Sequence, residues 1–573
     1  MHRPDRGELA LLIVLSLVLF GYVSSFVLFV LLGWDLEPVR PWSMVQVAWT
    51  YGTLPPSSAA TSVAFGGAAV AALVAARFSA PRKALFGDSR FARRGELRRQ
   101  RLRDPAGLLL GKVGGDFVRN DEPLHALVCA PTRSGKGVGV VVPNILAWDG
   151  SLIVLDIKAE NFEITSGYRA IVGRVFKFSP MSVHTHRYNP LDAVRPDITH
   201  RLTDLQQLAA ILVPAPERSG RTTMWEDEAR DLFVGVALYV LDTPDVPHTI
   251  GEIYRTLKTD ADLADVIESW FGARKEELDP ACVQSLGSFR HKAPKERSGV
   301  KSTLTAALML WSNPVVDAAT AASDFDLREL RRRRISLYVA VPLGELPVLK
   351  RLLNLFFQQA VAVLTRELPT GKDPHQVLLM LDEFASLGRM EVLADALPFL
   401  AGFRVRMVTI LQGLGQLDEL YGRGGASSIL QNCALQVFFA ANDQQTASYV
   451  SERLGFQTVR TMSRSVPMAL SSSSGSRSYA QTRRELLLPQ EVRAMADDAS
   501  VVFKEGCRPS RIRKIRYYRE RAFSSRLLPH VRVPTLDVLP RSLGALPASP
   551  SSQLSEFGQE LAELLASDDR VTS

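Results

Sequence analysis

Short apolar runs, separated by polar or glycine-containing turns, recur in two blocks of the chain. The blocks span about residues 108–180 and 334–520. Such runs between helix-compatible segments are typical of buried strands in a parallel sheet covered by helices on both faces. We therefore predict an α/β fold. The predicted strands are residues 124–129, 151–156, 174–178, 335–341, 376–381, 404–411, 435–440 and 500–504.

In the segment between the two blocks, the apolar residues recur with a different period. In residues 199–212 and 225–241 the apolar residues recur at helical spacing, and comparable strand runs are lacking from 190 to 325. We predict that residues 190–325 form an all-helical insertion domain. Residues 107–189 and 326–524 then form one α/β domain.

Two later segments have a polar composition. Residues 463–483 are serine-rich and predict a flexible excursion between α/β elements. Residues 525–573 are rich in proline and serine and then acidic, which predicts a flexible C-terminal tail with little core of its own.

The first 78 residues are mostly apolar. Residues 9–32 carry no charge, and their length suffices to cross about 30 Å of hydrocarbon. Residues 57–76 are uncharged, rich in alanine and glycine, and form a second, weaker candidate span. Aromatic residues suited to a membrane interface lie between them. We predict a two-helix transmembrane anchor in residues 1–78.

Charge determines the predicted orientation of this anchor. The chain carries a net charge of +8, and residues 79–103 alone contain nine basic and two acidic residues. An excess of basic residues beside a span marks the cytoplasmic side and can touch anionic lipid headgroups. Residues 79–106 are thus predicted to be a basic juxtamembrane segment, with the bulk of the chain in the cytoplasm. The four cysteines have no metal or disulfide spacing, which fits a reducing compartment.

A candidate phosphate-binding turn follows the first predicted strand. Its backbone N–H groups would contact phosphate oxygens, and its lysine would place an ammonium between the β- and γ-phosphates. Alanine replaces the first glycine of the usual pattern, and a glycine stands where a Mg²⁺-binding serine or threonine is usual. The alternative is an ordinary strand-to-helix turn. The residues are Ala130, Pro131, Thr132, Arg133, Ser134, Gly135, Lys136 and Gly137.

A second motif lies at residues 377–384, where an apolar strand ends in Asp382 and Glu383. Asp382 can hold the Mg²⁺ that bridges the phosphates. Glu383 can act as general base on the attacking water. The alternative is an acid pair that caps the next helix. Together with Lys136, the motif predicts a hydrolase of ATP or GTP.

The predicted strand 151–156 also ends in an acid, Asp156, which competes for the metal role. Ile157 and Lys158 follow, so it lacks an adjacent catalytic glutamate. We interpret it as the neighbouring strand, with Asp156 and Lys158 near the phosphates. A structural turn without function is an equally good interpretation.

With these motifs the chain resembles the coupling proteins of type IV secretion systems, the TraG-like conjugal transfer ATPases. The resemblance covers about residues 86–169 and 336–503. The glycine after Lys136 looks like this family's own form of the loop. The motifs that carry the resemblance are residues 130–139, 156–161, 381–384, 412–417 and 431–432.

The resemblance implies a RecA-like P-loop NTPase domain that forms a homo-hexameric ring at the bacterial inner membrane and uses ATP and Mg²⁺. Such rings recruit relaxase-bound DNA, or effector proteins, to a type IV secretion channel. Gln412 would sense the γ-phosphate. An arginine from a neighbouring subunit would complete the site, with Arg404 as first candidate and Arg406 as second.

Two other functions stay open. One is a coupling ATPase for effector-protein secretion, and the other is an FtsK-like DNA translocase. The helical insertion, the two predicted spans and the lack of a recognisable C-terminal winged-helix region argue against the translocase. We expect cargo recognition in residues 190–325, with the acidic tail as a second contact.

Overall fold

The computed structural model describes residues 85–215, 224–464 and 477–538, together with residue 67 and parts of the segment 17–51. The chain divides into two compact units. One comprises Met1–Asp88 and Thr458–Thr482, and the other comprises Ser89–Gln457 and Arg483–Ser573.

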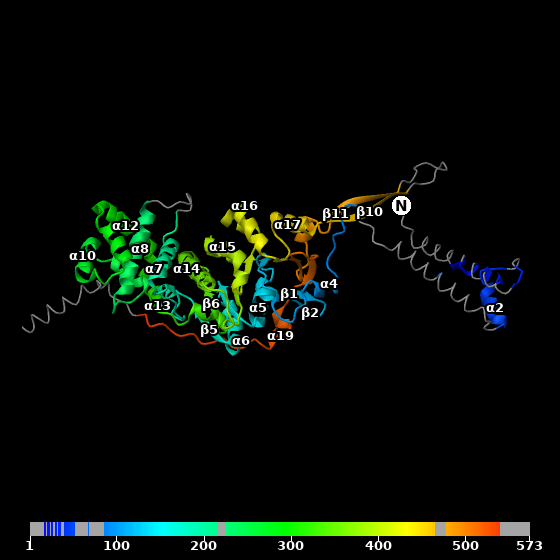
Figure 1. The fold of residues 1–573 in the computed structure, drawn as a ribbon, viewed down its shortest axis with the longest axis horizontal. Coiled ribbons are helices and arrows are strands. Elements are labelled where there is room, and N and C mark those ends of the chain that lie inside the picture. Colours follow the sequence, from blue (N-terminus) through cyan, green and yellow to red (C-terminus); the bar gives the residue numbers. More distant parts are fainter. Residues whose placement is uncertain are drawn as a thin grey trace, which may run out of the picture. The chain divides into compact units, whose positions relative to one another are not determined.

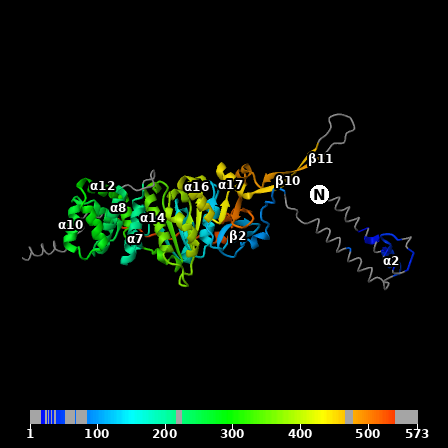
Figure 2. The same ribbon diagram turned by 45° about the horizontal axis from the view of Figure 1, so that its top comes forward.

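The larger unit is built on a sheet that has 11 strands within the described residues (Figures 1 and 2). The strands are β1 (Leu108–Val113), β2 (Asp116–Asn120), β3 (Ala126–Cys129), β4 (Ser151–Asp156), β5 (Arg174–Phe178), β6 (Ile335–Ala340), β7 (Val377–Leu381), β8 (Val405–Leu411), β9 (Leu435–Phe438), β12 (Ala499–Lys504) and β13 (Ser510–Arg513). Their order is β2-β1-β13-β12-β9-β3-β8-β7-β4-β6-β5. The strands from β9 to β5 run parallel, and those from β12 to β2 add antiparallel neighbours.

Both faces of the parallel part are buried. Successive side chains of a strand point to opposite faces. Leu127 and Leu379 belong to the core on one face, whereas Val128 and Met380 belong to the core on the other. The predicted α/β class and all eight predicted strands are confirmed. Strands β1, β2 and β13 were not predicted, because they mix charged residues or glycine with apolar ones, as is common for antiparallel strands near an edge.

Helices pack around this sheet. They are α4 (Glu96–Arg99), α5 (Val142–Ala147), α6 (Glu160–Val172), α14 (Leu346–Thr365), α15 (Glu391–Leu400), α16 (Gly415–Asn432), α17 (Gln444–Leu454), α18 (Pro489–Arg493) and α19 (Arg521–Ser524). Helix α14 is the longest of them and buries most of its leucine and phenylalanine side chains.

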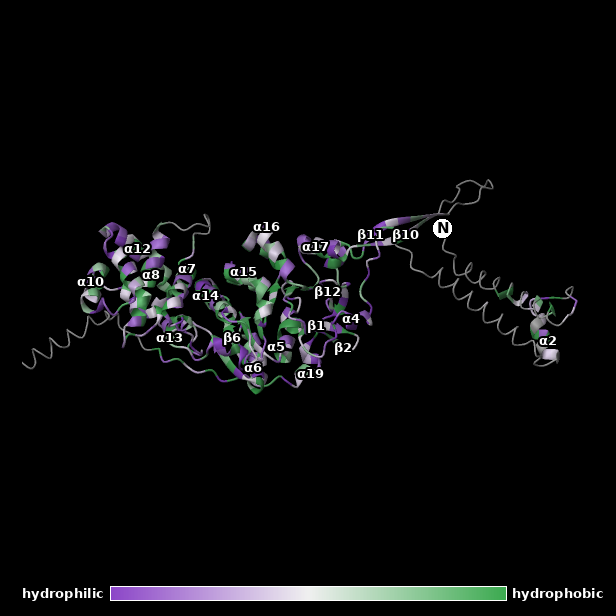
Figure 3. Cartoon of the chain, in the orientation of Figure 1, coloured by the Kyte–Doolittle hydropathy of each residue, from purple (hydrophilic) through white to green (hydrophobic). Residues whose placement is uncertain are grey.

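Between β5 and β6 the described residues form helices and short 3-10 turns without any strand. Side-chain oxygens cap several helix N-termini by accepting backbone N–H bonds; the capping residues are Asp197, Thr249, Asp262, Asp279 and Asn313. Hydrophilic and hydrophobic residues alternate around these helices, as expected where one face is buried (Figure 3). The helices are α7 (Ile198–Leu212), α8 (Met224–Asp242), α9 (Ile250–Leu257), α10 (Leu263–Arg274), α11 (Pro280–Arg290), α12 (Pro294–Ala307) and α13 (Pro314–Ala319).

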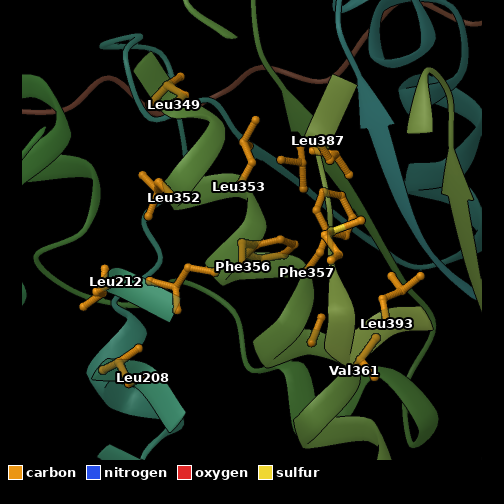
Figure 4. Close-up of a cluster of buried hydrophobic side chains, with 14 of the residues drawn as sticks. Leu208, Leu212, Leu349, Leu352, Leu353, Phe356, Phe357, Val361, Leu387 and Leu393 are labelled. Atoms are coloured by element: carbon orange, nitrogen blue, oxygen red, sulfur yellow. The ribbon is translucent and has the colours of Figure 1, made fainter. Parts of the chain in front are cut away.

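The insertion shares its core with the sheet domain. Leu208 and Leu212 of α7 lie close to Leu352 and Phe356 of α14, and the far side of α14 faces residues such as Leu393 of α15 (Figure 4). Burial of these side chains is the main favourable free energy that holds α7 on the domain.

Residues 89–106 belong to the folded domain, which differs from the predicted boundary at 107. Leu97 of α4 and Leu102 are only 2% and 1% exposed and pack in the sheet core. Part of the positive charge is also paired, since Arg90 Nη2 lies 2.6 Å from Glu96 Oε1. The difference arises because apolar residues alternate with the basic ones and reach the core, which net charge does not reveal.

Residues 525–538 contact the domain instead of starting a flexible tail. The Val531 backbone N–H donates to Ser166 Oγ at 3.2 Å, and His184 and Thr535 form an antiparallel bridge. Val533 packs against the core. The rest of the predicted tail lies outside the described residues.

Strands β10 (Phe456–Arg464) and β11 (Arg477–Glu485) form a separate two-stranded sheet. The predicted serine-rich excursion, residues 463–483, therefore falls partly on these strands. Its central part lies outside the described residues.

The predicted location in the bacterial inner membrane is wrong, because the structure contradicts it. Most of the predicted spans, 9–32 and 57–76, lie outside the described residues. Among the residues that are described, no helix is both long and apolar enough to cross a membrane. Helix α2 (Ser43–Tyr51), for example, has 9 residues, whereas a span needs about 20. The two-helix anchor is not confirmed.

Candidate functional site

The candidate phosphate-binding turn leaves the sheet at the carboxyl end of β3. The Ala130 N–H donates to the Leu411 carbonyl at 2.8 Å, which keeps the chain in the sheet until the turn begins. Arg133 and Gly135 then adopt positive φ angles of 62° and 84°. Glycine enters this region at little cost. The chain continues through Lys136 into a π-helical turn, η1 (Gly137–Val141), and helix α5.

Lys136 lies beside both acids of the second motif. Its Nζ is 3.2 Å from Asp382 Oδ1 and also forms an ion pair with Glu383. The acids follow β7, which is separated from β3 only by β8. Because β3, β8 and β7 are parallel, their carboxyl ends meet at one edge of the sheet and bring together residues far apart in sequence.

Gln412 connects the turn to Glu383. It follows β8, and its Nε2 donates to Glu383 Oε2 at 3.0 Å. Its Oε1 accepts a hydrogen bond of 3.0 Å from Thr132 Oγ1. A single amide thus contacts both the turn and the candidate general base.

Asp382 is the residue best placed to hold a metal ion. Burial raises the pKa of its carboxyl, and the nearby Lys136 charge opposes this rise. Its Oδ1 is buried and has no hydrogen-bond partner among the described residues, apart from the Lys136 ion pair. Carboxylate oxygens are the ligands that Mg²⁺ prefers, so this oxygen fits such an ion. A Cβ added to Gly137 would meet no atom within 4 Å, so the missing hydroxyl at that position does not reflect lack of space.

Asp156 makes the contacts of a helix-capping acid. Its Oδ2 accepts the Phe162 N–H at 2.8 Å, and its Oδ1 accepts from Asn161 Nδ2 at 3.3 Å. Burial raises the pKa of Asp156 to about 6. Lys158 is 70% exposed and lies beside Glu160. These contacts favour the structural interpretation of this turn.

The two candidate arginines differ sharply in exposure. Arg406 is 1% exposed, its guanidinium stacks over Trp148, and burial lowers its pKa to about 10. A side chain so placed cannot reach another subunit. Arg404 is more accessible and donates to the Asp373 carbonyl at 2.5 Å, at the start of β8. It is not brought together with Lys136.

One contact at the turn was missed by the sequence analysis. Lys514, directly after β13, donates from Nζ to the Ser134 carbonyl at 3.0 Å. The residues are 380 positions apart, and a lone lysine after a short amphipathic strand carries no motif that points to the turn.

Comparison with known proteins identifies the family. A family model described as "Type IV secretory system Conjugative DNA transfer" matches residues 90–536. The chain belongs to this family. It is 34% identical to Protein VirD4 of Agrobacterium fabrum over 84% of this chain and 72% of that protein. It is 30% identical to the conjugal transfer protein TraG of Escherichia coli over 80% of both chains.

Solved structures show the same fold. The bacterial conjugative coupling protein TrwBdeltaN70 matches with a TM-score of 0.56 and 20% identity, covering 78% of this chain and 97% of that one. The plasmid coupling protein TrwB in complex with ADP and Mg²⁺ matches with a TM-score of 0.56 and 19% identity, covering 78% and 98%.

Proposed function

We propose that this coupling protein is an ATPase that hydrolyses ATP at the Lys136 site to drive conjugative transfer of relaxase-bound DNA into a type IV secretion channel. The observation that carries the proposal is the meeting of Lys136, Asp382, Glu383 and Gln412 at the carboxyl ends of adjacent parallel strands. Family membership and the TrwB complex with ADP and Mg²⁺ support it.

Phosphate binding falls to the turn. The turn supplies backbone N–H groups, among them that of Gly135, and Lys136 supplies the positive charge for the β- and γ-phosphates. The ammonium has two carboxylates within reach in this structure. Bound phosphate oxygens would replace these carboxylates as its partners, which frees Asp382 and Glu383 for other tasks.

Asp382 would hold Mg²⁺ through its buried Oδ1. When bound, the ion neutralises charge on the phosphate oxygens. Glu383 accepts a proton from the attacking water, and Gln412 orients both the water and the carboxylate through the bond that it already makes to Glu383 Oε2.

The arginine that completes the site is proposed to be Arg404 of a neighbouring subunit in a homo-hexamer. Arg404 lies at the opposite end of β8 from Gln412 and so cannot reach its own subunit's phosphates. An arginine supplied in trans stabilises the charge of the transition state.

Cargo recognition is proposed for the helical insertion, residues 190–325, with the acidic C-terminal tail as a second contact. The insertion follows the edge strand β5 and returns to β6, so it stands at the end of the sheet and leaves the nucleotide site free. A pull-down with a relaxase–DNA complex tests this. Capture of protein effectors in place of the relaxase complex would assign the chain to effector secretion.

The ATPase itself is tested by Lys136→Ala. We expect loss of ATP binding and hydrolysis with an unchanged circular dichroism spectrum, because the partly buried ammonium contacts the carboxylates of the site and does not pack in the apolar core. Lys372→Ala, at an exposed turn, is the control and should keep wild-type turnover. Normal turnover by Lys136→Ala would contradict the assignment.

A further inference from the structure

A lysine from the C-terminal region, Lys514, contacts the backbone of the proposed phosphate-binding turn. Lys514 follows β13, and its backbone N–H donates to the Asp498 carbonyl at 2.7 Å, which fixes where its side chain starts. Its Nζ then reaches the Ser134 carbonyl at 3.0 Å. The ammonium also lies 3.9 Å from the centre of the Phe439 ring, an attractive cation–π distance.

These partners place Lys514 on the side of the turn opposite to the acids. Phe439 follows β9, which neighbours β3 on one side, and its N–H donates to the Cys129 carbonyl at 3.0 Å. Gln412 and the two acids follow β8 and β7, on the other side of β3. The turn therefore lies between Lys514 and the groups proposed to bind and hydrolyse the nucleotide.

The orientation of the Ser134 carbonyl decides where the next N–H points. In a planar trans peptide the carbonyl of one residue and the N–H of the next point in opposite directions. A carbonyl held outward by Lys514 therefore directs the Gly135 N–H toward the inside of the turn. Phosphate binding needs inward N–H groups, and a carbonyl turned inward would repel the phosphate.

The surroundings of Lys514 favour its contact with the Ser134 carbonyl over other polar contacts. Its side chain is half-buried, and burial lowers its pKa, while Asp497 and Asp498 oppose that effect through their charges. It forms no ion pair within 4 Å among the described residues, so the Ser134 carbonyl is its closest polar partner. Gly139 packs against Ile515 and Lys514, and a Cβ there would lie 3.3 Å from the Ile515 carbonyl oxygen. The segment after β13 is thus closely packed on the start of the helix that follows the turn.

We propose that Lys514 is a positioning residue for the nucleotide site: its ammonium holds the Ser134 carbonyl on the outer side of the turn, so that the Gly135 N–H faces the phosphates. The proposal rests on the proposed nucleotide-binding function of the turn. It adds a contact, remote in sequence, that the motif of residues 130–137 does not include.

The test is Lys514→Met, which keeps much of the apolar stem and removes the ammonium. We expect the dissociation constant for Mg–ADP, measured by calorimetry on the full chain, to rise roughly tenfold, because a hydrogen bond from a charged donor is lost. Lys514→Arg should restore most of the affinity, since a guanidinium can also donate to the carbonyl.

Lys504→Met is the control for the loss of a buried ammonium elsewhere on the sheet. Lys504 Nζ also donates to a backbone carbonyl, that of Gln100 at 2.6 Å, and forms an ion pair with Glu122, away from the turn. The Lys504→Met substitution should lower the thermal unfolding midpoint of the protein without changing the dissociation constant for Mg–ADP. A merely structural role for Lys514 would give the same result as Lys504, and that outcome overturns the proposal.

Two further variants keep the outcome clear. If Lys514→Met does not fold, Phe439→Leu replaces it; removing the ring beside the ammonium should weaken Mg–ADP binding roughly threefold, and wild-type affinity overturns the proposal. Lys136→Ala is measured in parallel. If it loses Mg–ADP binding while Lys514→Met binds like the wild type, only the positioning role fails. If Lys136→Ala binds Mg–ADP like the wild type, both the positioning role of Lys514 and the proposed function fail.

Discussion

Arg404 and Gln412 lie at opposite ends of the same strand. Arg404 immediately precedes β8 and Gln412 immediately follows it. At about 3.3 Å per residue the two backbone positions are roughly 26 Å apart. Gln412 contacts the turn and Glu383, whereas Arg404 contacts the Asp373 carbonyl. One subunit therefore presents its amide and its accessible arginine at opposite ends of β8, which is the arrangement that the proposed ring requires for a shared site.

Arg404→Asn should reduce ATP hydrolysis about 10³-fold and leave nucleotide affinity near the wild-type value, because an arginine supplied in trans acts on the transition state. Asparagine is chosen because Arg404 has a φ of 58°, a region that asparagine tolerates. Mixing Arg404→Asn with Lys136→Ala protein should restore part of the activity, measured as phosphate release. Mixing Arg404→Asn with the Lys136→Ala, Arg404→Asn double variant is the control and should restore none.

Glu383→Gln should bind ATP with near wild-type affinity but hydrolyse it at least 10²-fold more slowly, because an amide keeps the shape of the side chain and cannot accept the proton. Single-turnover phosphate release and equilibrium ATP binding measure the two effects separately. A loss of ATP binding as large as that of Lys136→Ala would show that Glu383 is structural.

The free energy of unfolding should fall in mild acid because the His125 side chain resists protonation in the folded state. It is 4% exposed, and its Nδ1 accepts the Met407 N–H at 3.0 Å, which ties the residue before β3 to β8. Burial lowers its pKa to about 4. The unfolded chain binds a proton near pH 6.5, so between these values unfolding takes up a proton and stability falls as pH falls.

Between pH 7 and pH 4, His125 should lower the unfolding free energy of the protein by up to about 3 kcal/mol. His125→Asn keeps an acceptor for the Met407 N–H but does not titrate. Denaturant unfolding at several pH values should therefore show a flatter profile for the variant. Parallel profiles for the two proteins would exclude His125 as the cause.

A fragment that starts at residue 89 should be more stable than one that starts at residue 107. The longer fragment keeps Leu97 and Leu102, which are almost fully buried. Burial of each leucine contributes about 2 kcal/mol, so the shorter fragment should lose about 4 kcal/mol of unfolding free energy. The longer fragment with both leucines changed to alanine should lose a similar amount. Equal unfolding midpoints for the two fragments would place the domain boundary at 107.

The apolar runs predicted the parallel strands well because these strands are buried on both faces and leave a continuous signal. The charge pattern was a weaker guide. Residues 79–103 are basic by composition, yet Leu97 and Leu102 anchor part of this segment in the core. The inner-membrane location inferred from charge and from apolar length is contradicted by the described helices, of which none can cross a membrane.

By itself the sequence determined the α/β class, and it singled out the turn around Lys136 as a candidate phosphate-binding turn and Asp382–Glu383 as a candidate acid pair, because each depends on neighbouring residues in a local pattern. The tertiary structure decided which distant residues meet them. The strand order β9-β3-β8-β7 sets Gln412 against Glu383 on one side of the turn and Lys514 against Ser134 on the other. It also buried Arg406 while leaving Arg404 accessible. Strand order is a property of long-range pairing, so side-chain chemistry along the chain does not specify it.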